Sequence, residues 1–107
     1  MTQLEIINEL KEKTAAFDGG SYDGFLAIQI TLSDLNEVFY LEIKDGKLSI
    51  EPYEYHDRQA NLIISSANFV KMINKKLNST LAFTTGKLKI EGSIGKASEL
   101  SKILANS

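Results

Sequence analysis

The amino-acid sequence predicts an α+β domain: a five-stranded, mainly antiparallel sheet with helices packed on one face, as a two-layer sandwich. Segments with apolar residues at every second position are interspersed with segments of helical spacing. The first three strands are joined by connections too short for parallel crossovers. Each strand has one apolar face, so we expect helices to cover that face and water to cover the other. With 107 residues, we expect a single domain over 1–107.

The chain opens on a predicted amphipathic helix. Thr2 and Glu5 have the spacing of a capping box, in which each side chain satisfies a free backbone donor of the first turn. Apolar residues then recur at helical spacing as far as Phe17, while most charged residues fall elsewhere. The run of Asp18, Gly19 and Gly20 is predicted to end this helix, because glycine tolerates a left-handed exit.

The next segment predicts three strands, of which the last two form a hairpin. Residues 24–32 and 37–44 alternate between apolar and polar, which is typical of strands with one buried face. Asp45 and Gly46 supply a tight turn, and Pro52 ends the third strand. A two-residue loop fixes the register, which pairs Ile43 with Leu48 and Leu41 with Ile50.

The second half predicts two further strands and three helices. Residues 60–65 form a short strand, and a helix follows from Ser65 to about residue 77. A shorter helix around 81–83 leads to a fifth strand at 87–91. Ser93 then caps a last helix, whose apolar face includes Ile94, Ala97, Leu100 and Leu104.

Composition excludes several classes of function. Lys and Arg total 12 against 14 Asp and Glu, which argues against a general nucleic-acid binder. The absence of cysteine excludes disulfides, cysteine zinc sites and cysteine nucleophiles. His56 is the only histidine and lies in a polar connection, so we expect no zinc site and no Ser–His–Asp triad. The glycine-rich residues 18–24 lack the lysine of a P-loop and the ligand pattern of an EF-hand. We therefore expect no enzyme, no metal and no cofactor.

The sequence also carries signals of cellular location and of surface charge. The N-terminus does not have the pattern of a secretory signal, and no apolar run is long enough to cross a bilayer, so we expect a cytoplasmic protein. Five lysines give the second half a positive bias: Lys71, Lys75, Lys76, Lys87 and Lys89. We favour a solvated surface as their explanation. The alternative is transient contact with an anionic membrane surface.

Large apolar residues of the helices have two possible roles. Periodicity shows that a side chain is buried, but it does not show whether the space around it is filled. On residue types alone we favour a plain core over an apolar cavity between helices and sheet. The residues concerned are Phe69, Ile73, Leu77, Leu81, Phe83, Leu100 and Leu104.

A family resemblance favours the cavity. The strongest signal is the run AFTTGKLKIEG at residues 82–92, which fixes a helix end, a glycine turn and an alternating strand together. It is preceded by ANLIIS at 60–65 and followed by a helix containing Ala97, Leu100 and Leu104. This pattern resembles the sterol carrier protein family, of the non-specific lipid-transfer type.

The resemblance implies a lipid-binding protein. Members hold fatty acyl chains, acyl-coenzyme A, phospholipids or sterols in an apolar tunnel between sheet and helices. The last helix tends to act as a cover, so we expect residues 92–107 to move, and Lys96, Ser98 and Ser101 make this helix more polar than a tight lid. Lys87 is a weak candidate for binding an anionic head group. The predicted walls are Ile28, Ile30, Phe39, Leu41, Phe69, Ile73, Leu77, Leu81, Phe83, Leu100 and Leu104.

Two other functions stay open at this point. The first is a filled-core interaction or dimerisation module, forming a homodimer or binding a partner through the strand before Pro52 and the aromatic pair Tyr53 and Tyr55. The second is an accessory domain that acts beside an acyl-handling enzyme.

Overall fold

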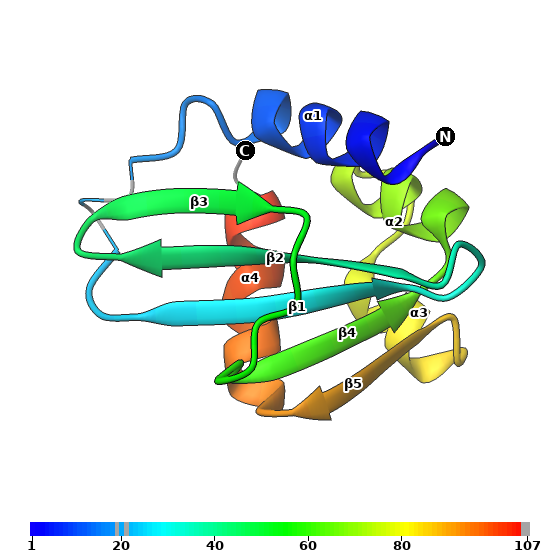
Figure 1. Cartoon of the computed structure of the whole chain (residues 1–107). Coiled ribbons are helices and arrows are strands. Elements are labelled where there is room, and N and C mark those ends of the chain that lie inside the picture. Colours follow the sequence, from blue (N-terminus) through cyan, green and yellow to red (C-terminus); the bar gives the residue numbers. More distant parts are fainter. Residues whose placement is uncertain (19, 21, 106–107) are drawn as a thin grey trace.

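The computed structural model describes residues 1–18, 20 and 22–105, which form a five-stranded sheet and four helices (Figure 1). The elements follow one another as α1 (Gln3–Lys13), β1 (Leu26–Leu32), β2 (Glu37–Lys44), β3 (Lys47–Glu51), β4 (Ala60–Ile64), α2 (Ser66–Ile73), α3 (Ser79–Thr84), β5 (Leu88–Gly92) and α4 (Ile94–Ala105). This confirms the predicted α+β class.

The sheet has the strand order β3-β2-β1-β4-β5. The first three strands form the predicted antiparallel meander, and β4 pairs antiparallel with β5. Only the central pair, β1 with β4, is parallel. The predicted hairpin register is confirmed, because Ile43 faces Leu48 and Leu41 faces Ile50. Positive φ at Asp45 and Gly46 closes this hairpin, as its two-residue turn requires.

The core lies between the sheet and the helices. One face of β1 and β2 supplies fully buried residues such as Ile28, Ile30 and Phe39. From α2, Phe69 packs against Phe39 edge to face, with ring centroids 5.7 Å apart at 76°. The long helix α4 crosses behind β1 and β4, and α1 lies along the β3 edge and contacts α2 (Figure 1).

Two helices end earlier than the sequence predicted. The helix α1 begins with the predicted capping box but stops at Lys13, where the Thr14 hydroxyl donates to the Leu10 carbonyl. The predicted exit at Gly19 lies outside the described residues. The helix α2 stops at Ile73 instead of near 77, because Lys75 turns into the left-handed region with φ 61°.

The second face of the sheet is less exposed than predicted. The connection between β3 and β4 crosses this face in front of β2 and β1 (Figure 1). On this face Gln29 and Asn61 are only 4% and 6% exposed, and Gln29 accepts a hydrogen bond from the backbone N–H of Tyr55 in the connection. Tyr55 packs edge to face on Tyr40 and donates its hydroxyl to Glu42 at 2.6 Å, and this hydrogen bond, with burial, raises the pKa of Tyr55 to about 12. Alternation along a strand does not reveal coverage by a loop.

Candidate functional site

Two adjoining cavities lie on the helical side, where α4 passes α3 and the end of α2. The larger has a volume of about 460 Å³, within the range of small-molecule sites, and the smaller has a volume of about 270 Å³. Both are lined by Ser79, Ser101 and Ala105, so they meet between α3 and the C-terminal half of α4. Together they extend from the end of α2 to β5.

The two cavities differ in chemistry. The larger is mostly apolar on its sheet and α3 sides, through Leu62, Phe83, Leu88 and Ile90. On its α4 side, Ile94, Ala97, Ser98 and Lys102 complete the lining with the shared residues and Thr80. The smaller cavity is more polar. Its remaining lining residues are Met72, Lys75, Leu77, Asn78 and Leu104.

Local structure fixes the two short elements that border the smaller cavity. The Asn78 side chain accepts hydrogen bonds from the backbone N–H of Thr80 and Leu81, at 2.8 and 3.1 Å, and so begins α3. Asn74 caps α2, and its amide donates to Glu9 of α1 at 2.8 Å. The chain between these caps contains Lys75, whose exposed side chain lines the cavity.

The helix α4 forms one whole wall and is held mainly by apolar contacts. Its inward residues Ala97, Leu100 and Leu104 are at most 5% exposed. On its outer side, Lys96 and Glu99 form an ion pair at 3.2 Å. Tyr22, from the connection before β1, lies beside this pair, where burial and the Glu99 carboxylate raise the pKa of its hydroxyl.

The eleven sequence-predicted wall residues fall into three groups. Leu77, Phe83 and Leu104 line the cavities. Leu81 lies on the surface of α3, with 56% of its area exposed. The other seven are buried in the core: Ile28, Ile30, Phe39, Leu41, Phe69, Ile73 and Leu100. Ligand contact by any of these residues stays a prediction. Lys87 is exposed and lines neither cavity.

Sequence reasoning missed most of the α4 wall. Ile94, Ser98, Ser101 and Ala105 lie three or four residues apart, so they form a stripe beside the buried face of the helix. The apolar pattern of α4 indicated the core-facing Ala97, Leu100 and Leu104, but it wrongly placed Ile94, which is 61% exposed, on the same buried face. A mixed stripe of small and polar residues carries no such signal. Ser98 and Ser101, noted as unusually polar for a lid, are part of this wall.

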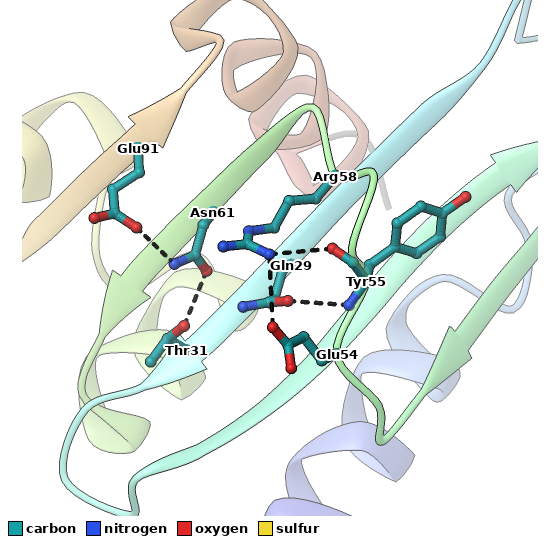
Figure 2. Close-up of polar contacts among 7 residues, drawn as sticks. All are labelled: Gln29, Thr31, Glu54, Tyr55, Arg58, Asn61 and Glu91. Atoms are coloured by element: carbon teal, nitrogen blue, oxygen red, sulfur yellow. Dashed lines mark hydrogen bonds and ion pairs between the residues drawn. The ribbon is translucent and has the colours of Figure 1, made fainter.

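The opposite face of the sheet carries a polar network (Figure 2). The Thr31 hydroxyl donates to Asn61 at 2.9 Å, and the Asn61 amide donates to Glu91 at 3.0 Å, which links three strands. Tyr55 donates its backbone N–H to Gln29, and its carbonyl accepts from Arg58 (Figure 2). These side chains satisfy one another and fix the loop to the sheet.

The two tyrosines predicted for a partner surface differ in how far they are exposed. Tyr53 is 64% exposed, whereas Tyr55 is engaged with Tyr40 and Glu42. His56 is exposed in the same connection. Across the described residues, no group of three or more His, Cys, Asp or Glu side chains is placed to hold a metal ion. None of the described helices is both long and apolar enough to cross a membrane.

Comparisons with known proteins agree with this architecture. Residues 6–105 match the model of the SCP-2 sterol transfer family. Hydroxysteroid dehydrogenase-like protein 2 of Xenopus tropicalis is 40% identical over 68 residues, which cover 62% of this chain and 16% of that protein. The chain thus spans about a sixth of the length of this curated relative.

Two solved structures share the fold. Sterol carrier protein-2 like-3 from Aedes aegypti has a TM-score of 0.76 at 18% identity, and the match covers all of this chain and 99% of that one. The solution structure of palmitated SCP2L2 from the same organism has a TM-score of 0.69 at 18% identity, over 97% of this chain and 95% of that one. With the family match over nearly its whole length, the chain belongs to the SCP-2 sterol transfer family.

Proposed function

We propose that this chain is an intracellular lipid-binding or lipid-transfer protein, which holds a fatty acyl or sterol-like ligand in the cavities between α3, α4 and β5 and does not transform it. The observation that carries the proposal is the larger cavity, whose walls include Leu62, Phe83, Leu88, Ile90 and Ile94. Each methylene moved from water to such walls contributes roughly 0.8 kcal/mol, so a long chain binds without a specific head-group contact.

The family match and one structural neighbour support the same proposal. The match is to a sterol transfer family, and the neighbour SCP2L2 was solved in a palmitated form. Walls of Leu, Ile and Phe distinguish apolar ligands only weakly, because one methylene changes the binding free energy by roughly 0.8 kcal/mol and no polar contact adds to it. We therefore expect broad selectivity for chain length.

Native mass spectrometry of the purified protein, beside titration with a fluorescent fatty-acid analogue, tests the proposal. The expected result is retained lipid mass, or saturable micromolar binding of the analogue that palmitate displaces. Protein that carries no lipid and leaves the analogue unbound would contradict the proposal and favour a module with a filled core.

Contact with anionic membranes is part of the proposal. Phe83 and Ile94 line the larger cavity yet are 43% and 61% exposed, and Leu81, from the same helix as Phe83, is 56% exposed. Residues 65–107 contain seven lysines and two glutamates, whereas residues 1–64 contain five basic and twelve acidic residues. Exposed apolar residues at the larger cavity, within a positively charged part of the sequence, suit contact with the surface of a bilayer that contains acidic lipids.

Vesicle sedimentation tests this contact. We expect the protein to sediment with phosphatidylserine-containing vesicles at low salt and to be released at high salt, because screening weakens the attraction. Vesicles of phosphatidylcholine alone should bind much less. Equal sedimentation with both kinds of vesicle would show that the lysines do not direct the contact.

A further inference from the structure

We propose that Lys75 binds the anionic head group of a single-chain amphiphile, in the first place the carboxylate of a fatty acid, whose chain extends into the larger cavity. The inference rests on the proposed function. It adds the direction in which the ligand lies and names Lys75 as the residue that favours acids over neutral lipids. Three observations carry it: the unequal polarity of the two cavities, the backbone conformation of Lys75, and the charges around this residue.

The polarity of the joined cavities matches that of an amphiphile. The smaller one is lined by the polar residues Lys75, Asn78 and Ser79, and by Ser101, whose hydroxyl already donates to the Ala97 carbonyl. Asn78 uses its side-chain oxygen to cap α3, and its amide group has no acceptor among the described residues, so it is free to donate. At the other end, Phe83 and its neighbours offer apolar walls. A ligand with one polar end and one long chain fits this arrangement in a single direction.

The backbone at Lys75 is costly for a lysine. Its φ of 61° is left-handed, in the position that follows the C-cap residue Asn74, where glycine is the preferred residue. A side chain with a Cβ is disfavoured in this conformation, whereas glycine adopts it readily. Non-glycine residues in such conformations often have a functional role. Within this turn, Lys75 alone has a charged side chain that lines the cavity.

No ion pair joins the Lys75 ammonium group to an acidic side chain among the described residues. Glu9 of α1 reaches the same turn, but its carboxylate accepts a hydrogen bond from the side chain of Asn74. Within 65–105 the acidic residues are Glu91 and Glu99, and these contact Asn61 and Lys96. Lys102 also lines the larger cavity, but there the neighbouring walls are mostly apolar. The smaller cavity therefore offers a cation together with uncharged donors, as a carboxylate requires.

Two substitutions of Lys75, measured with dodecanoate and dodecanol by isothermal titration calorimetry, test the inference. Lys75→Gln removes the charge and should weaken dodecanoate binding about tenfold while changing dodecanol binding less than twofold, since only the acid uses a charge-assisted contact. Lys75→Gly should weaken dodecanoate binding similarly and raise the melting temperature by a few degrees, since it relieves the left-handed lysine. A purely structural role would not combine a loss of affinity with a gain in stability.

Lys71→Gln is the matched control, and Lys102→Gln tests the other lysine that lines a cavity. Lys71 is exposed on α2 and lines neither cavity, so its variant should bind dodecanoate like the wild type. Unchanged dodecanoate binding in both Lys75 variants, or an equal loss of dodecanol binding, would overturn the inference, as would a tenfold loss confined to Lys102→Gln. A wild type that binds dodecanol as tightly as dodecanoate would overturn the head-group inference alone. A wild type that binds neither would overturn the proposed function as well.

Discussion

Replacing Ser101 with tryptophan is expected to abolish binding of a fluorescent fatty-acid analogue while the protein stays folded. Ser101 lines both cavities and is only partly exposed, so an indole at this position would fill the space where they meet. If the indole keeps several methylenes of the ligand out of the cavity, the binding free energy falls by roughly 0.8 kcal/mol for each methylene, which amounts to several kcal/mol. We expect affinity to fall by at least about a hundredfold, as measured by fluorescence titration, with circular dichroism reporting the fold.

Two control variants distinguish a blocked cavity from a general loss of protein structure. Ser101→Ala removes only a hydroxyl that donates to the Ala97 carbonyl at 3.2 Å, and should bind the analogue nearly as the wild type does. Thr84→Trp places the same indole on an exposed residue of α3 that lines neither cavity. If folded Ser101→Trp protein bound the analogue with wild-type affinity, the ligand would have to lie elsewhere.

The largest expected change in stability follows from Phe39→Ala. The ring of Phe39 is fully buried and packs edge to face against Phe69, which joins the sheet to α2. Truncating a buried phenylalanine costs about 3–5 kcal/mol, from lost transfer free energy and from the cavity left behind. Since small domains are stable by about 5–15 kcal/mol, this variant should lose a large part of its free energy of unfolding. Urea denaturation followed by circular dichroism measures the loss.

A surface aromatic residue provides the control for this substitution. Tyr53 is 64% exposed, so Tyr53→Ala should change the free energy of unfolding by less than about 0.5 kcal/mol. A loss below about 1 kcal/mol for Phe39→Ala would mean that the core between β2 and α2 closes around the missing ring, and would contradict the packing described above.

Much of the fold could be predicted from local chemistry. The Asp45-Gly46 turn and the alternation on either side of it determined both the hairpin and its register. The capping box at Thr2 and the serine at position 65 indicated helix starts correctly. Helix ends were harder to predict, because Thr14 and Lys75 end α1 and α2 without the glycine that usually signals an end.

The candidate site was harder to predict, for two physical reasons. Hydrophobic periodicity identifies buried side chains, so it selected core residues such as Ile28 and Phe39 together with true cavity neighbours such as Phe83. Empty space depends on how α3 and α4 are placed in three dimensions, which no local pattern records. Ser98 lines the space because of where α4 lies, and Lys75 lines it in a turn with a left-handed backbone angle.

The central claim is that an acyl chain lies between α3, α4 and β5. It is tested most directly by nuclear magnetic resonance of the protein with a bound fatty acid whose chain carries ¹³C. We predict intermolecular contacts from the chain methylenes to the side chains of Phe83, Ile94 and Ala97. Contacts only to residues of the opposite face of the sheet, such as Tyr53, or chain signals identical to those of the free fatty acid, would contradict it.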